Sequence, residues 1–183
     1  MANISESDTI AGAWIVEPSI HGDQRGLFIE TYRREWFPHG REMVQGNRAN
    51  RQRGAIVGLH YHLHQADYWY VPFGHARVVL HDLREGGPTD GATLELDLTG
   101  ENHLGVFIPP GVAHGFGSLT DVTITYLVDG YYNAADELGV AWDDPEVAGD
   151  WGIAQPDMSD RDRSNPKRSE LAEHFRPVWP LRT

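Results

Sequence analysis

Short runs of apolar residues, separated by turn-forming residues, recur along most of the 183-residue chain. The clearest is the stretch 94–98, where leucines alternate with Glu95 and Asp97, so that one face of a strand would be apolar and the other acidic. Glycine and proline lie between the runs, where hairpins must turn. The pattern predicts strands at 14–16, 27–32, 55–62, 68–71, 76–83, 93–98, 105–108 and 122–128. Such a series is typical of an antiparallel β-sandwich or β-barrel.

Helical patterns are confined to two short stretches of the chain. We expect helices at 33–37 and 169–175, the second capped by Ser169. Residues from 148 onward are polar, but Trp151 and Trp179 indicate that this tail is tied back to the body. We therefore expect one domain over residues 1–183, with a core at about 12–147 and a tail at 148–183 packed on it.

Composition and charge exclude several classes of function. Lysine and arginine total 15 against 27 acidic residues, and the net charge of −12 argues against nucleic acid or an anionic membrane as a partner. The absence of cysteine excludes disulfides and thiolate chemistry. The N-terminus lacks the basic start and apolar run of a secretory signal, and the sequence has no apolar stretch long enough to span a bilayer. We expect a soluble cytoplasmic protein.

Histidines form the most distinctive chemical feature of the chain. His60, His62 and His64 occupy alternate positions, and His114 follows a proline–glycine corner. Residues two apart on a strand point to the same face. One such imidazole in a β-barrel can serve as a general base, whereas several can hold a metal ion.

Ordered motifs elsewhere in the chain give it a resemblance to a known enzyme family. They are the stretch Asp23-Gln24-Arg25-Gly26-Leu27-Phe28-Ile29-Glu30, Gln45-Gly46-Asn47, Gly58-Leu59-His60-Tyr61, Asp82-Leu83-Arg84, residues 108–116, Tyr126, Tyr131-Tyr132, Glu137, residues 142–145 and residues 159–162. From about residue 14 to residue 162 the chain resembles the dTDP-4-dehydrorhamnose 3,5-epimerase family. The resemblance implies an all-β, cupin-type jelly roll with short peripheral helices. It also implies a homodimer and a nucleotide-diphosphate sugar as substrate, with no cofactor.

The resemblance assigns catalysis to three residues. Substrates of the family carry a ketone at sugar C4, which acidifies the hydrogens on C3 and C5. His60 matches the base that removes one of these protons, a task that suits a neutral imidazole at cellular pH. Asp162 matches the acidic partner of that base, and Tyr126 matches the proton donor. The implied reaction is epimerisation at C3 through an enolate, with C5 as a second position.

The resemblance also assigns substrate binding to a larger set of residues. These are Arg25, Phe28, Glu30, Gln45, Asn47, His114, Tyr131, Glu137 and Arg161. Arg25 and Arg161 would contact the diphosphate, because a guanidinium matches phosphate oxygens in bidentate fashion. Phe28 and Tyr131 would stack on the nucleotide base. On spacing alone, however, Arg25 is typical of a solvated turn residue, Tyr126 of an ordinary barrel residue and Asp162 of a surface acid.

Departures from the family pattern gather around His60 and support a second hypothesis. Val57 stands where an arginine is usual, His62 replaces a glutamine, and Asp67 replaces a lysine. With His60 and His114, the last two match the metal-binding pattern of cupins, so a metal-dependent cupin would bind a divalent transition metal through His60, His62, Asp67 and His114. A histidine that binds a metal cannot also be the free base. A third hypothesis is a non-catalytic sugar-binding cupin.

Overall fold

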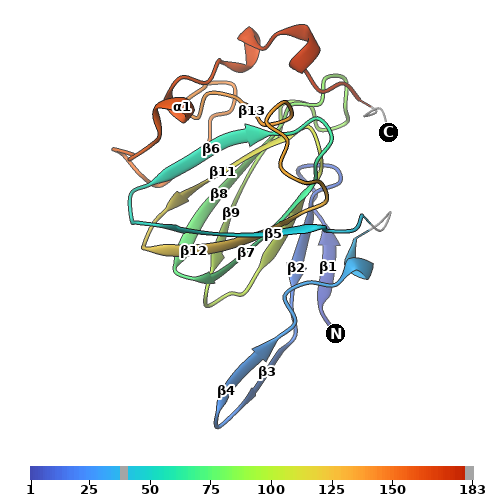
Figure 1. Cartoon of the computed structure of the whole chain (residues 1–183), viewed down its shortest axis with the longest axis vertical. Coiled ribbons are helices and arrows are strands. Elements are labelled where there is room, and N and C mark those ends of the chain that lie inside the picture. Colours follow the sequence, from blue (N-terminus) through green and yellow to red (C-terminus); the bar gives the residue numbers. More distant parts are fainter. Residues whose placement is uncertain (38–40, 180–183) are drawn as a thin grey trace.

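Two antiparallel sheets face each other in the computed structural model, which describes residues 1–37 and 41–179 (Figure 1). One sheet has the order β1 (Asn3–Glu6), β2 (Trp14–Glu17), β10 (Gly105–Ile108), β7 (Asp67–Phe73), β12 (Val122–Val128) and β5 (Gln45–Arg51). The other has the order β13 (Leu138–Gly139), β6 (Ile56–Tyr61), β11 (Val112–Ser118), β8 (His75–Asp82) and β9 (Thr93–Thr99). This arrangement confirms the predicted all-β jelly roll.

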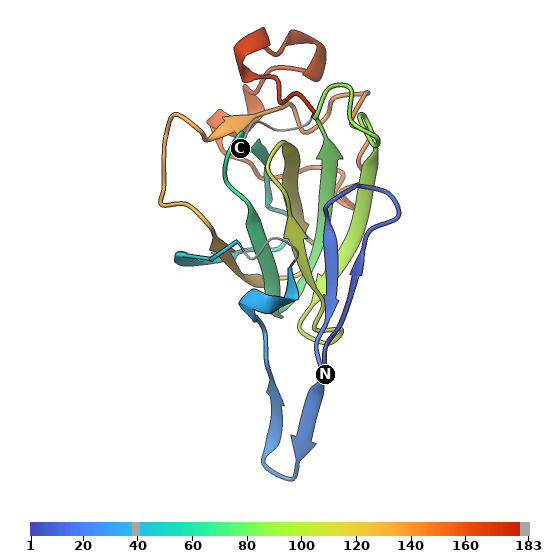
Figure 2. The same ribbon diagram turned by 90° about the vertical axis from the view of Figure 1, so that its right-hand side faces the viewer.

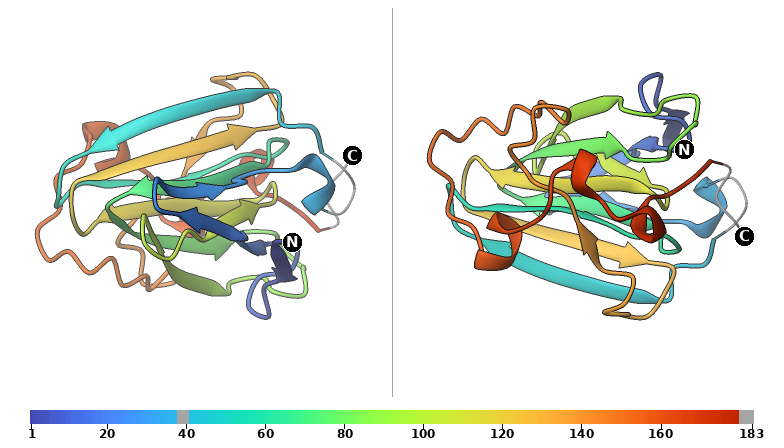
Figure 3. Two further views of the ribbon diagram at one scale, coloured as in Figure 1. Left: turned by 90° about the horizontal axis from the view of Figure 1, so that it is seen from below. Right: turned by 90° about the horizontal axis from the view of Figure 1, so that it is seen from above.

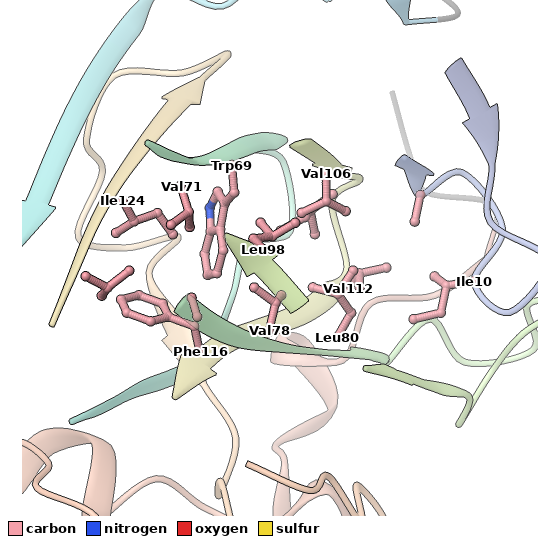
Figure 4. Packing of buried hydrophobic residues seen from close by; sticks show 14 residues of the cluster. Ile10, Trp69, Val71, Val78, Leu80, Leu98, Val106, Val112, Phe116 and Ile124 are labelled. Carbon is pink, nitrogen blue, oxygen red and sulfur yellow. The ribbon is translucent and has the colours of Figure 1, made fainter. Parts of the chain in front are cut away.

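The main hydrophobic core fills the space between the two sheets. Figure 4 shows Trp69 and Ile124 from the first sheet packed against Val78, Leu80 and Phe116 from the second. The alternation read at 94–98 holds in β9, because its leucines pack on this core while Glu95 is exposed. Burial of these apolar side chains is the main favourable contribution to folding.

The sequence pattern did not predict five of the strands, and two of these border the site described below. β5 reads Gln-Gly-Asn-Arg-Ala-Asn-Arg and has no apolar run, although its odd-numbered residues from 45 to 49 are half-buried and its even-numbered residues are exposed. β11 is buried along its whole length, so its sequence shows no alternation. The others are β1, β13 and the first strand of a hairpin.

That hairpin, β3 (Ile20–Asp23) and β4 (Gly26–Ile29), projects from the body of the molecule (Figures 1 and 2). We call it the arm. Its apolar side chains lie in solvent, with Leu27 and Phe28 60% and 64% exposed. Neither strand pairs with the two main sheets.

Helix is sparse, as the sequence indicates. The stretch 33–37 forms the 3-10 turn η1 (Arg34–Trp36), and 169–175 forms two such turns, η2 (Arg168–Glu170) and η3 (Glu173–Phe175). The predicted cap at Ser169 is wrong, because Ser169 lies inside η2. An additional short helix, α1 (Asp160–Arg163), was not predicted. Across residues 1–37 and 41–179, no helix is long and apolar enough to cross a membrane.

The tail from residue 148 runs across the outer face of the five-stranded sheet (Figure 3, right). Trp151 is buried there, and its Nε1 donates to the carbonyl oxygen of Trp142 at 3.0 Å. Near the end of the tail, the backbone N–H of Trp179 donates to the Glu85 carbonyl at 3.0 Å. This packing brings α1 against β6.

A buried ion pair explains the Asp82-Leu83-Arg84 motif. The guanidinium of Arg84 donates to both carboxylate oxygens of Asp82, at 2.8 Å and 2.6 Å, and to the carbonyl of Ala11 at 2.7 Å. Both side chains are almost fully buried. Burial alone would raise the pKa of Asp82, but hydrogen bonds from Arg84 and Thr89 outweigh it and hold that pKa below its ordinary value. The motif is therefore structural.

Candidate active site

A cavity of about 780 Å³ opens between the two sheets. β5, β7 and β12 supply one wall, β6 and β11 supply the opposite wall, and the loop 129–137 lies at the rim. The inward-facing residues of β5, which include Gln45 and Asn47, line the first wall. His60, His62 and His64 all line the cavity, but only His60 lies on β6, and the other two follow the end of that strand.

His60 is hydrogen-bonded to Asp162, although the two residues are far apart in the sequence. His60 Nε2 lies 2.7 Å from Asp162 Oδ1, and the backbone N–H of Gly58 donates to Asp162 Oδ2 at 3.2 Å. Asp162 is only 4% exposed, and it reaches β6 because Ser159 caps α1 by accepting the Asp162 N–H at 3.1 Å. The tail thus delivers the carboxylate to the histidine.

The hydrogen bonds of Asp162 decide its charge. Burial alone would raise the pKa of Asp162, but the hydrogen bonds from His60 and Gly58 outweigh it and hold that pKa below its ordinary value. Asp162 is therefore an ionised acceptor at neutral pH, and Nε2 of His60 carries the hydrogen. In the neutral ring, Nδ1 then keeps its lone pair. Among the described residues Nδ1 has no hydrogen-bond partner, so it can accept a proton from a molecule in the cavity.

Close packing of β6 against β11 fixes the position of His60. Gly58 has a φ of +115°, and a Cβ there would lie 2.7 Å from the Cα of Gly115. Any larger residue would push the strands apart. The register of the two strands sets His60 opposite His114.

Tyr126 lies on the opposite wall. It belongs to β12, where it is paired with Asn47 on one side and Trp69 on the other. Burial, with the nearby charge of Asp67, raises the pKa of the Tyr126 hydroxyl, which therefore stays protonated at neutral pH. Within the described part of the chain, no hydrogen bond engages this hydroxyl. It is available as a proton donor.

A second group of ionisable side chains, His62, Asp67 and His114, lies in the same cavity. We call it the His–Asp–His cluster. Burial lowers the pKa of His114 to about 4, so this imidazole is neutral at pH 7. Its Nδ1 lies 3.0 Å from the carbonyl oxygen of Val112, which can only accept a hydrogen bond. Neutral His114 therefore presents a lone pair to the cavity.

The structure gathers only part of the predicted substrate-binding set. The residues that line the cavity are Gln45, Asn47, His114, Tyr131 and Glu137. Arg161 does not line the cavity but holds Glu137, because its guanidinium donates to a carboxylate oxygen and to the backbone carbonyl of Glu137 at 2.9 Å and 3.0 Å. Arg25, Phe28 and Glu30 do not line the cavity, because Arg25 and Phe28 lie on the arm and Glu30 directly follows it.

Several cavity residues were missed by reasoning from the sequence. They are Arg41, Arg51, Gln65, Trp69, Asp129, Tyr132 and Asp136. The alternation of β5 could have identified Arg51, which follows Gln45, Asn47 and Ala49 on the same face. The role of Asp136 has no sequence signal: its carboxylate accepts the backbone N–H groups of Leu63 and His64, at 2.7 Å and 3.1 Å, and so shapes the turn after β6.

The geometry supports acid–base chemistry on a ring held between the sheets. An oriented histidine on one wall can remove a proton, and a phenol on the other wall can return one. Neither group requires a bound metal for this task. The cavity is also large enough for a sugar and part of a group attached to it.

Comparisons with known proteins place these features in context. The profile of a family described as dTDP-4-dehydrorhamnose 3,5-epimerase matches residues 7–170. A Shigella flexneri protein of that name is 34% identical over 161 residues, covering 84% of this chain and 89% of the relative.

Two solved structures extend the similarity to the fold. A dTDP-6-deoxy-D-glucose-3,5-epimerase from Legionella pneumophila, in complex with dTDP-4-keto-L-rhamnose, is 31% identical with a TM-score of 0.92, covering 98% of this chain and 99% of that one. A 3′-monoepimerase from Streptomyces bikiniensis, in complex with dTDP-quinovose, is 33% identical with a TM-score of 0.88, covering 96% and 93%.

Proposed function

The chain belongs to the dTDP-4-dehydrorhamnose 3,5-epimerase family, and we propose that it epimerises a dTDP-linked 4-keto-6-deoxy sugar at C3. The observation that carries this proposal is the placement of His60 and Tyr126 on opposite walls of one cavity. Epimerisation requires that a proton leave one face of the sugar ring and return to the other. A ring bound between the sheets would present one face to each residue.

The reaction divides into two proton transfers. His60 Nδ1 takes the proton from C3, the C–H electron pair forms the C3–C4 double bond, and the carbonyl π pair moves to the C4 oxygen to give an enolate. Asp162 stabilises the imidazolium as it forms. The Tyr126 hydroxyl then delivers its proton to C3 from the opposite face, and the C4 ketone re-forms. Exchange of protons with water returns both residues to their starting states.

Residues of this chain alone carry both proton transfers. We infer that neither transfer needs a redox cofactor or prosthetic group. The tail supplies Asp162, so we also infer that residues 148–183 belong to the same functional domain as the jelly roll. The cytoplasmic location stays a prediction.

We propose further that the active form is a homodimer. The arm carries Arg25 and Phe28 away from the cavity of its own chain, and it exposes Leu27 and Ile20. Exposed apolar side chains on an isolated hairpin mark an interaction surface. Docking of the arm on a second copy would bring Arg25 and Phe28 to that copy's cavity, where they would contact the dTDP moiety.

Deuterium exchange tests the proposed reaction. Incubation with dTDP-4-keto-6-deoxyglucose in D₂O should introduce deuterium at C3, and the position of the label decides whether C5 also reacts. His60→Ala should abolish this exchange, because it removes the imidazole that is hydrogen-bonded to Asp162 and that accepts the proton. Exchange at the unaltered rate in His60→Ala would overturn the mechanism.

Mixed dimers test the role of the arm. An Arg25→Ala/Phe28→Ala double variant and the His60→Ala variant should each be weak or inactive alone. If the arm acts on the partner subunit, co-expressed chains should regain activity, because each mixed dimer has one site with both an intact arm and an intact base. A mixture no more active than its components would contradict docking in trans.

A further inference from the structure

The His–Asp–His cluster lies beside the base but is separate from it. The ligand atoms of His62, Asp67 and His114 all lie within 4.8 Å of one another. His62 Nε2 is 3.9 Å from Asp67 Oδ1, and His114 Nε2 is 4.0 Å from Asp67 Oδ2. These distances are too long for hydrogen bonds. The three groups therefore point at a common region without bonding to one another.

Backbone carbonyls orient both imidazoles of the cluster. His62 Nδ1 lies 2.7 Å from the carbonyl oxygen of Asp136, and His114 Nδ1 lies 3.0 Å from that of Val112. A carbonyl oxygen accepts but does not donate, so both Nδ1 atoms carry hydrogen, and in the neutral form of each ring Nε2 carries the lone pair. Histidines that bind metal ions are held in this way, with the second ring nitrogen fixed by an outer hydrogen bond.

Asp67 is oriented as strongly as the two histidines. Gln65 Nε2 donates to Oδ1 at 2.9 Å, and Trp69 Nε1 donates to Oδ2 at 3.1 Å. The carboxylate is only 4% exposed. In the part of the chain that the structure describes, the basic groups within ion-pair distance of Asp67 are the two imidazoles of the cluster. A buried carboxylate is stable only when a cation or a full set of donors compensates its charge.

We propose that His62, Asp67 and His114 form a three-ligand site for a divalent transition metal of the Zn²⁺, Fe²⁺ or Mn²⁺ type. Two imidazoles with one carboxylate suit such ions. Ligand atoms about 2.1 Å from a tetrahedral ion lie about 3.4 Å apart. The two observed separations run to different oxygens of Asp67 and exceed this by about half an ångström, and the three ligand atoms all lie within 4.8 Å of one another. Binding an ion therefore requires the side chains to rotate toward it. The remaining coordination positions face the cavity.

His60 is outside this site. Its Nε2 is hydrogen-bonded to Asp162 at 2.7 Å, and it is not among the three residues whose ligand atoms converge. The four-residue metal set expected from the sequence therefore divides into a base with its carboxylate and a three-residue site. A metal ion and a free base can then occupy the same cavity.

A metal ion at this site would give the cavity the positive charge that the proposed reaction needs, an argument that rests on the proposed function. An enolate oxygen needs positive charge or hydrogen-bond donors. The cluster alone offers a carboxylate and two lone pairs, which would repel that oxygen. A divalent ion on Asp67 reverses the sign of this region and would polarise a ketone oxygen that occupies an open coordination position.

Metal analysis of the untagged full-length protein tests the proposal directly. After loading with Zn²⁺ or Co²⁺ and dialysis, we expect about one ion per chain, with Co²⁺ giving the visible absorption of a low-symmetry nitrogen–oxygen site. His62→Gln and Asp67→Asn should each weaken binding by more than about 100-fold, because loss of a ligand should exceed the effect of losing an outer-shell partner. His64→Gln is the matched control and should bind metal normally, since His64 lines the same cavity but lies outside the cluster. Circular dichroism verifies that each variant is folded.

The outcomes separate this site from the proposed function. Wild-type protein that binds no metal, or folded cluster variants that bind as well as wild type, would overturn the site. The deuterium exchange assay, run on metal-loaded and chelator-treated protein, reports on the reaction independently. Metal binding without deuterium exchange would support the metal site and contradict the epimerase activity. Deuterium exchange in protein that cannot bind metal would support the epimerase activity and contradict the metal site.

Discussion

Replacing Asp162 with asparagine removes the negative charge that faces the base and keeps the shape of the side chain. When His60 accepts a proton, the imidazolium and the carboxylate become an ion pair whose nearest atoms are 2.7 Å apart. Their side chains are only 19% and 6% exposed, so water screens the pair weakly. With charge centres about 4 Å apart and an effective dielectric constant of about 20, the attraction is about 4 kcal/mol.

That energy sets the expected loss of rate. At about 1.4 kcal/mol per tenfold change, losing the attraction slows proton removal by about 10³-fold. An equivalent substitution in the serine-protease triad lowers kcat by about 10⁴, partly because asparagine selects the wrong tautomer of histidine. We therefore expect Asp162→Asn to exchange deuterium at C3 about 10³-fold more slowly than wild type.

The rate of deuterium uptake, followed by mass spectrometry with saturating substrate, measures this effect. Asp160→Asn is the matched control, because Asp160 is exposed on the same helix and its replacement changes the net charge equally. Thermal unfolding of both variants shows whether loss of the Gly58 contact has altered the fold. A rate for Asp162→Asn within tenfold of wild type would refute the role of the carboxylate, as would an equal loss in Asp160→Asn.

Three further predictions concern Tyr126 and the buried ion pair. Tyr126→Phe should retain deuterium exchange, because His60 can return a deuteron to the same face, while formation of the epimer falls by about 10²–10⁴; equal loss of both would contradict separate roles. Because the pKa of Tyr126 is raised from 10.0, its hydroxyl stays protonated as pH rises, and deprotonation of this hydroxyl should not limit epimer formation below pH 10.0. A decline at about pH 8 that depends on Tyr126 would contradict this. Arg84→Met should lower the free energy of unfolding in urea by about 3–5 kcal/mol, because Asp82 is left buried without its cation, and Arg84→Met/Asp82→Asn should recover part of the loss; a single variant as stable as wild type would show that the pair is dispensable.

The fold was largely predictable, because alternating apolar residues indicate a strand and identify which of its faces is buried. β10 and β12 coincide with the predicted ranges, and the leucines of β9 face the core. β5 was missed for a physical reason: its inward face lines a polar cavity and not the core, so its residues carry no apolar period. β11 was missed because it is buried along its whole length and Gly115 and Gly117 interrupt its apolar residues, whereas the equally buried β10 reads as an unbroken apolar run.

The site was predictable only in part from residue types. Alternating histidines indicate a shared face, and His60, His62 and His64 do line one cavity, although His62 and His64 lie beyond the end of β6. Pattern alone could not bring Asp162 to His60, because that contact depends on how the tail crosses the sheet. Nor could it separate His60 from His62, since the division between base and cluster is set by hydrogen bonds to Asp162 and Asp136. The position of the arm residues relative to a cavity could not be predicted from one chain, because their proposed partner is a second copy.

Solvent deuterium incorporation at C3 of dTDP-4-keto-6-deoxyglucose, compared between wild type and His60→Asn, tests the central claim most directly. The replacement keeps a polar side chain of similar length but removes the imidazole that accepts the proton. We predict rapid labelling at C3 with wild type and none above the uncatalysed rate with the variant. Labelling by folded His60→Asn at the wild-type rate, or no labelling by wild type, would contradict the assignment of His60 as the base.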